Sequence, residues 1–289
     1  MVKQDPSASV YSPFDTIRHD GYLEGGFACI RVRSPGSGTV GGRPPTGASV
    51  RRGRRPSLFP PPVDFAQQLA LIAPVLLFAM VAHEYAHGYA AFRQGDMTAY
   101  QLGRLTWNPL RHIDPFMTVI LPVMLAFLGG PIFGGAKPVP VNPRNYRNYK
   151  RGDIIVSLAG VATNVVIAIL SVPVIMLVGL LGDQLPTLMR PLAILQQMLA
   201  MGIFINLMLA AFNLMPIPPL DGSHVFKYLL PPQWSLQYQR LGGIGLLILF
   251  AVLSFGRPIV NLWLSPAYIL RAVAERFYFP YLLPNPFAG

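Results

Sequence analysis

The chain has 289 residues, of which 52% are hydrophobic and only 12% are charged. Soluble domains carry about 25% charged residues, so this composition excludes an ordinary soluble enzyme and indicates a protein embedded in a membrane. The formal net charge is +11, but the excess lies in flanks and loops and not on a basic face studded with aromatic residues, so no nucleic-acid partner is expected.

Residues 1–63 read as a basic, polar tail. The stretch from Ser34 to Pro62 contains too much Gly, Pro and Ser to hold a hydrophobic core, which predicts disorder. The tail also lacks the apolar centre of a secretory signal, so the first hydrophobic helix is expected to direct membrane insertion.

Five later segments contain no Asp, Glu, Lys or Arg. They are residues 65–83, 116–136, 154–182, 191–220 and 241–256. All but the last reach the roughly 20 residues that a spanning helix needs, and the last falls a little short. We therefore predict an all-α polytopic membrane protein with about four to six membrane helices, in which residues 64–230 form the core and residues 231–289 add a transmembrane helix and an aromatic interfacial tail.

The first helix is expected to run from Asp64, as N-cap, to about Arg93, with Gly95 as its stop. The apolar segment 116–136 is interrupted by Pro and Gly, which favours a re-entrant insertion over a straight crossing. The stretch AKPVPVNPRN after it alternates Pro with β-branched residues and indicates an extended segment between the first and second core helices.

The sequence HEYAH at the end of the first apolar run carries the clearest chemical signal. Residues four apart share a helix face, so His83 and His87 can offer ring nitrogens to one metal ion, with Glu84 placed beside a metal-bound water. This is the pattern of zinc hydrolases. An ionisable side chain near the bilayer centre costs roughly 2.5–3.5 kcal/mol, so such residues are usually functional there.

A third ligand must be His, Asp or Glu, because a single cysteine, Cys29, excludes a multi-cysteine metal site and an intrachain disulfide framework. Asp221 is the best candidate, since prolines unwind the backbone just before it at the end of an apolar helix. Its alternative role is in a helix-end turn or in a salt bridge of the C-terminal loop. Other acids, namely Asp153, Asp183 and Glu275, have no comparable membrane setting.

HEYAH in one apolar helix and NLMPIPPLDG after another resemble the motifs of the site-2 protease family of intramembrane zinc metalloproteases. A third family element appears as GVATN, Gly160 to Asn164, although Val161 stands where the family usually has proline. The resemblance covers about residues 65–230 and is to the short prokaryotic branch without a PDZ domain.

The resemblance implies an intramembrane metalloprotease core with one zinc ion per chain, held by His83, His87 and Asp221. It implies Glu84 as general base and Asn164 as a polar group near the scissile carbonyl, with an amide that packs helices together as the alternative for Asn164. The substrate would be a transmembrane protein cleaved in the bilayer. His112 and Asp114 receive no role, and His224 reads as an interfacial histidine.

The motifs also constrain topology, because all three must meet at one depth. The first and fourth apolar segments must therefore run in the same direction and the third opposite, which again requires 116–136 to be re-entrant. The basic loop from Lys137 to Arg151 then places the active site near the cytoplasmic face of a prokaryotic cell membrane. The same logic puts the arginine cluster at residues 51–55 outside, against the positive-inside rule.

Two other functions remain open from the sequence alone. A membrane carrier could pass Zn²⁺ through buried His and Asp, but it has no need of Glu84, and the internal repeats common in transporters are absent. A membrane protein that binds client helices without cleaving them is the other alternative. Oligomeric state and the natural substrate are not encoded in any recognisable feature.

Overall fold

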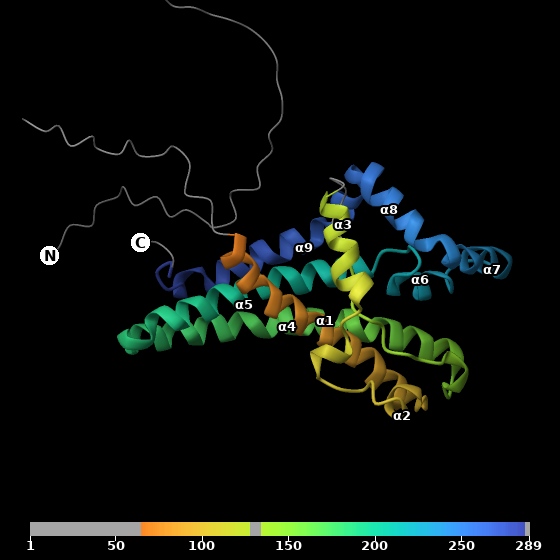
Figure 1. The fold of residues 1–289 in the computed structure, drawn as a ribbon, viewed down its shortest axis with the longest axis horizontal. Helices are drawn as coiled ribbons and strands as arrows, with labels where there is room; N and C mark the ends of the chain where they lie inside the picture. Colours follow the sequence, from red (N-terminus) through yellow and green to blue (C-terminus); the bar gives the residue numbers. More distant parts are fainter. Residues whose placement is uncertain (1–64, 128–133, 287–289) are drawn as a thin grey trace, which may run out of the picture. The chain divides into compact units, whose positions relative to one another are not determined.

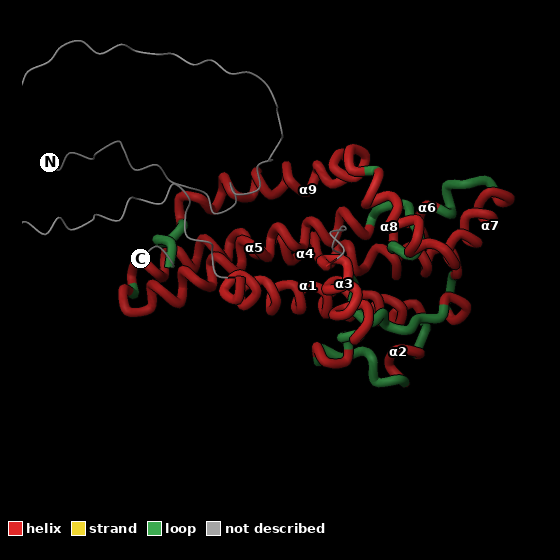
Figure 2. Tube along the Cα trace, turned by 45° about the horizontal axis from the view of Figure 1, so that its top comes forward, coloured by secondary structure: helices red, strands yellow, loops and turns green. Residues whose placement is uncertain are grey.

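A computed structural model describes residues 65–127 and 134–286. Within these ranges every regular element is helical and no strand is present, as an all-α architecture requires. The expectations for residues 1–63 and for an N-cap at Asp64 concern residues outside these ranges. Figure 1 shows the fold, and Figure 2 shows the helices and the loops that connect them.

Four long helices dominate: α1 (Phe65–Gln94), α4 (Tyr149–Gln184), α5 (Met189–Asn213) and α9 (Arg257–Tyr278). The shorter α-helices are α2 (Thr98–Gln101), α3 (Leu121–Phe127), α6 (Asp221–Phe226), α7 (Pro232–Arg240) and α8 (Gly245–Phe255). Single turns of other helix types are η1 (Pro109–Arg111), η2 (Pro115–Ile120), η3 (Pro143–Asn145), η4 (Pro186–Leu188), η5 (Leu241–Ile244) and η6 (Phe279–Tyr281). The predicted end of the first helix is confirmed, since α1 stops at Gln94 and Gly95 has a φ of 109°.

Four helices in the described residues are long and apolar enough to cross a membrane. They span Leu69–Gln94, Tyr149–Gln184, Pro186–Asn213 and Pro232–Phe255. The last is longer than the apolar run 241–256, because the more polar α7 precedes it and η5 joins it to α8. The protein is thus an all-α, multi-span membrane protein.

The three core helices run as their motifs require. Val156 of α4 contacts His87 of α1, and eight residues later Asn164 contacts Ala79, so α1 and α4 are antiparallel. Asn164 also contacts Asn206 of α5, whereas Gln196, earlier in α5, contacts Ile175, later in α4. Helices α1 and α5 therefore point the same way and α4 opposite, as Figure 1 shows.

The re-entrant prediction concerns the chain between α1 and α4. Helices η2 and α3 together cover 13 residues, about 20 Å at 1.5 Å per residue, which is short of a bilayer core of about 30 Å. The chain also returns to its starting point, since Gly135 N–H donates to Met117 O and the Thr118 hydroxyl donates to Gly135 O. The described ends of this segment therefore lie together, as a re-entrant insertion requires.

Two apolar clusters join the core helices to the C-terminal helices. In the first, Ile175 of α4 and Ile203 of α5 are 0% and 1% exposed and pack with Tyr278 of α9. In the second, Met215 and Leu220 pack against residues of α8 and α9. The second cluster fixes the loop that leads to Asp221. Helix α9 therefore belongs in part to the packed core, although its aromatic residues predicted an interfacial position.

Candidate metal centre

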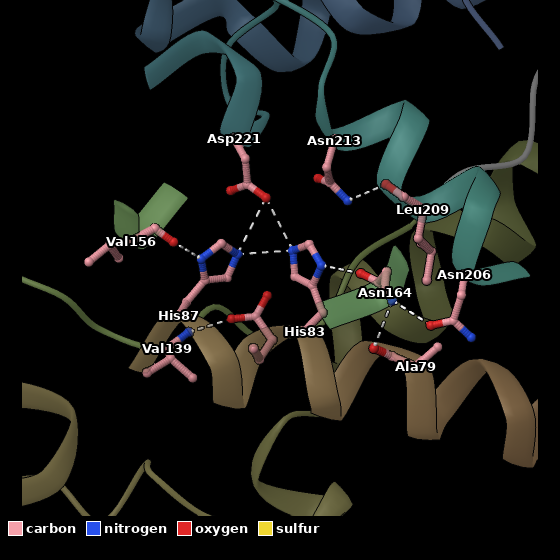
Figure 3. Close-up of polar contacts among 11 residues, drawn as sticks. Ala79, His83, His87, Val139, Val156, Asn164, Asn206, Leu209, Asn213 and Asp221 are labelled. Atoms are coloured by element: carbon pink, nitrogen blue, oxygen red, sulfur yellow. Dashed lines mark hydrogen bonds and ion pairs between the residues drawn. The ribbon is translucent and has the colours of Figure 1, made fainter. Parts of the chain in front are cut away.

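The two histidines of HEYAH and the aspartate of LDG meet where α1, α4 and α6 come together (Figure 3). His83 Nε2 and His87 Nε2 lie 3.2 Å and 3.3 Å from Asp221 Oδ2, and the two nitrogens are 2.9 Å apart. The three residues offer ligand atoms that all lie within 4.8 Å of one another. Residues 134 positions apart in the sequence thus converge on one point.

Each imidazole makes a hydrogen bond at Nδ1, and this bond leaves Nε2 facing the cluster of ligand atoms. His87 Nδ1 lies 2.7 Å from the carbonyl oxygen of Val156, and His83 Nδ1 lies 2.5 Å from Asn164 Oδ1. Both oxygens only accept, so each Nδ1 carries the proton and each neutral ring presents a lone pair at Nε2. Carboxylate and carbonyl partners orient metal-binding histidines in this way.

These three converging atoms fit a cation and little else. Asp221 Oδ2 is shielded from solvent and has no hydrogen-bond partner, although it lies 3.2 Å and 3.3 Å from the two imidazole nitrogens. Three lone-pair donors that face each other in an apolar setting repel one another unless a positive charge lies between them. Two imidazoles and one carboxylate are the ligand types that catalytic zinc sites use, with a fourth position left for water or substrate.

Gly160 provides the space beside this cluster. A Cβ built at this position would lie 2.5 Å from His87 Nε2 and 2.6 Å from His83 Nε2. A side chain at position 160 would therefore occupy the volume between the imidazoles and α4. The glycine of GVATN is required by this close approach.

Glu84 lies beside the two histidines and is held by the backbone of the extended segment. Its Oε2 accepts a hydrogen bond of 2.8 Å from Val139 N–H, a contact also drawn in Figure 3. Side chains of Arg104 and Asp96 hold this extended segment in place. Arg104 donates to the carbonyls of Lys137 and Pro138, and Asp96 accepts from Asn142 N–H at 2.6 Å. A carboxylate held at the edge of the cluster is placed to exchange protons with a water bound there.

Asn164 is 0% exposed, and both ends of its amide are engaged. Its oxygen meets His83, while its nitrogen donates to Asn206 Oδ1 at 2.7 Å and approaches Ala79 O at 3.4 Å. Asn206 in turn donates to Gly202 O at 2.8 Å. These contacts join α4 to α1 and α5, as the helix-packing alternative for Asn164 requires, and its role near the scissile carbonyl stays a prediction.

Comparison with known proteins identifies the family. The family model described as Peptidase family M50 matches residues 71–255, more than half of the chain. The chain belongs to peptidase family M50. This confirms the resemblance to the site-2 proteases that HEYAH and LDG indicated.

Individual relatives agree. The chain is 36% identical over 178 residues to a Bacillus subtilis protein named "Putative zinc metalloprotease YwhC", a match that covers 61% of this chain and 77% of that protein. It is 30% identical over 202 residues to the Rip2 protein of Mycolicibacterium smegmatis, which has the same description, covering 70% and 73%. An archaeal relative, MJ0611 of Methanocaldococcus jannaschii, is 32% identical over 132 residues, covering 44% and 62%. No solved structure matches the chain.

This M50 peptidase is therefore a membrane zinc metalloprotease, and its chemistry uses zinc. The sequence did not predict the residues that contribute backbone groups to the site, or the second asparagine, Asn206, that supports Asn164. Val139 contributes an N–H and Val156 a carbonyl, neither of which has a sequence signature. Asn206 could have been found, since a lone Asn in the middle of an apolar helix is costly unless it has a partner.

Three polar residues for which the sequence predicted no metal-binding role contribute no atom to the ligand cluster. His112 is 1% exposed and its Nε2 donates to Thr106 O at 2.8 Å, so it stabilises the loop after α2. Asp114 caps η2 by accepting from Phe116 N–H and Met117 N–H. His224 lies on α6, with its Nδ1 3.4 Å from Asp153 Oδ1.

Proposed function

We propose that this M50 peptidase hydrolyses peptide bonds within or near transmembrane segments of membrane proteins. His83, His87 and Asp221 hold the zinc ion, and Glu84 acts as general base. The observation that carries the proposal is the convergence of two Nε2 lone pairs and one carboxylate oxygen beside Glu84, at the ends of helices long enough to span a bilayer.

Zinc, when bound, polarises the scissile carbonyl and lowers the pKa of a water from 15.7 to about 7. Glu84 accepts the proton of the attacking water and returns it to the leaving amine. The Val139 N–H that now donates to Glu84 fixes the carboxylate and its direction. Backbone N–H groups nearby are candidates to stabilise the developing oxyanion.

A substrate helix has its peptide bonds shielded by its own hydrogen bonds, so it must unwind before cleavage. The extended segment Lys137–Asn142 offers a backbone against which an unwound substrate can lie by strand addition. Prolines at 138 and 140 have no N–H, and the N–H groups of Lys137, Val139 and Asn142 already donate to His112 O, Glu84 and Asp96. A substrate strand would therefore pair mainly with carbonyl oxygens of this segment. We propose that the unwound substrate lies between this segment and the metal.

We further propose that the site faces the cytoplasm in a cell membrane. The chain from the extended segment to the first turn of α4 lies at the same end of the helices as the metal centre, and its basic residues are exposed: Lys137, Arg144, Arg147, Lys150 and Arg151. Loops rich in Lys and Arg are retained on the cytoplasmic side.

The test is cleavage of a model single-span substrate in liposomes by purified protein and its Glu84→Gln variant, with zinc measured in both. Glu275→Gln on α9 is the matched control, because it removes the same charge far from the ligands in sequence. We expect the wild type and the control to cleave within the span, and Glu84→Gln to keep its zinc and lose cleavage.

Two other results would count against the proposal. Zinc binding with no cleavage by the wild type over a broad panel of membrane segments would favour a client-binding protein. Zinc flux into sealed liposomes that survives Glu84→Gln would favour a carrier, since transport has no use for a general base.

A further inference from the structure

One face of α4 contacts both proposed histidine ligands and the helix that carries the third proposed ligand, Asp221. Asp153, Val156, Gly160 and Asn164 follow one another at intervals of three or four residues, so they lie along one stripe of the helix, and all four are buried. Asn164 binds His83, and the carbonyl of Val156 binds His87. The remaining polar member of this stripe, Asp153, has no part in the mechanism above.

Asp153 is a buried carboxylate, 3% exposed, whose partners all come from α6 and the turn that follows it. Its Oδ2 lies 2.6 Å from Lys227 Nζ and accepts a hydrogen bond of 2.8 Å from the Tyr228 hydroxyl. Its Oδ1 lies 3.4 Å from His224 Nδ1. Lys227 is itself only 8% exposed, so the two charges depend on each other.

Helix α6 carries Asp221 as its first residue and ends at Phe226, directly before Lys227. Its N-cap position, Leu220, offers no capping side chain, and the loop before it contains three prolines. The orientation of the Asp221 carboxylate is therefore set by what anchors α6 as a unit. Two of those anchors are the apolar packing of Met215 and Leu220 and the polar contacts to Asp153. A third is the ring contact between Phe226 and Tyr238 of α7.

We propose that Asp153 is a positioning residue for the metal centre and acts through Lys227 and His224 to orient α6 and its carboxylate ligand. The same stripe of α4 then orients both histidines and the aspartate. The inference rests on the proposed zinc ligands. It explains why a carboxylate and a lysine are buried together about two helical turns from the metal-facing glycine.

The experiment measures the metal, not cleavage. The purified 289-residue protein is freed of bound metal, and its affinity for Zn²⁺ is then measured by competition with a chelator. The visible absorption spectrum of the protein loaded with Co²⁺ reports the geometry of the metal ligands. The variants are Asp153→Asn and the double variant D153N/K227M, which removes both charges and so avoids leaving an unpaired lysine in the core. Asp183→Asn, an exposed acid near the other end of α4, is the control.

We expect Asp153→Asn and the double variant to lose about 10- to 100-fold in zinc affinity and to change the Co²⁺ spectrum, with Asp183→Asn unchanged. If Asp153→Asn fails to fold, the double variant alone decides the outcome. Wild-type zinc affinity and a wild-type Co²⁺ spectrum in a folded variant would overturn the inference and leave the proposed function standing. If the wild type itself binds no zinc, the proposed ligands and the inference both fail.

Discussion

Asn164 Oδ1 lies 2.5 Å from His83 Nδ1 in a contact that is fully buried between α4 and α1. The Asn164 amide cannot flip to exchange its oxygen and nitrogen, because the nitrogen donates to Asn206 Oδ1 at 2.7 Å. The orientation of His83 is therefore fixed by a chain of two asparagines that starts on α5. Polar groups buried in this way are costly if one partner is lost, so the chain acts as a unit.

Replacing Asn164 separates two roles for this residue. If the amide orients His83, Asn164→Leu should lower zinc affinity about 10- to 100-fold, in line with the loss of other partners of metal-bound histidines. If it contacts the scissile carbonyl instead, kcat should fall while zinc affinity stays unchanged. Chelator competition and steady-state kinetics on the same preparation distinguish these results.

Asn261→Leu on the exposed side of α9 is the matched control for this change. Asn206→Leu should give a smaller loss in the same direction, since it removes only the support of Asn164. Equal zinc affinity in wild type and Asn164→Leu would contradict the positioning role.

Gly160→Ala tests the space between α4 and the imidazoles. The added methyl group would lie 2.5 Å from His87 Nε2, so the two rings cannot keep their present positions. We expect zinc binding to be lost. In a helix interior Ala is favoured over Gly by about 1 kcal/mol, so the helix itself should not be weakened.

The measurement is zinc content after purification, with circular dichroism to verify the fold. Gly202→Ala on α5 is the control, because its Cβ would meet only Val75 Cγ1, at 3.4 Å. Retention of stoichiometric zinc by Gly160→Ala would show that the histidines bind metal in another arrangement.

The sequence predicted those parts of this protein that depend on local pattern. Gly95 ended α1 as expected, and an isolated carboxylate after three prolines pointed to Asp221 because acids are rare in apolar surroundings. The convergence of HEYAH, GVATN and LDG was predictable because motifs mark all three, but contacts that no motif marks were not. Neither the Val139 N–H nor the burial of Asp153 with Lys227 follows from the residues alone, since both depend on which helices pack together.

Removal of zinc should abolish cleavage but leave the helices folded. The main apolar cluster contains Ile175, Ile203 and Tyr278, none of which is a proposed ligand, and its packing needs no metal. Zinc adds stability of RT ln(1 + [Zn]/Kd), about 2.7 kcal/mol at 100 times Kd, so the melting temperature should rise with added zinc. Circular dichroism and melting of chelated and reloaded protein test this. Loss of most helical signal on chelation would contradict it.

Asp96 provides a prediction about pH. Burial alone raises the pKa of this carboxyl, but hydrogen bonds from Asn142 N–H, from the Thr98 hydroxyl and amide and from the Asn145 side chain lower it more, so its pKa lies below the usual range. A carboxylate whose pKa is depressed by folding stabilises the folded state above its unfolded pKa of about 3.9, and this contribution is lost as the pH falls through the folded-state pKa.

Asp96→Asn should therefore lower the melting temperature at pH 7, by an amount that corresponds to roughly 1–3 kcal/mol for a buried group whose hydrogen bonds are disrupted. The difference from wild type should stay constant down to about pH 5 and shrink below about pH 4, where the wild-type carboxylate becomes protonated. Melting curves from pH 3 to pH 8 provide the measurement, and Asp183→Asn, an exposed acid, is the control. A difference that does not vary with pH would show that the asparagine acts through shape and not through charge.

Because Asp96 holds Asn142 and the segment that contains Val139, the variant should also cleave more slowly at neutral pH while its zinc content is unchanged.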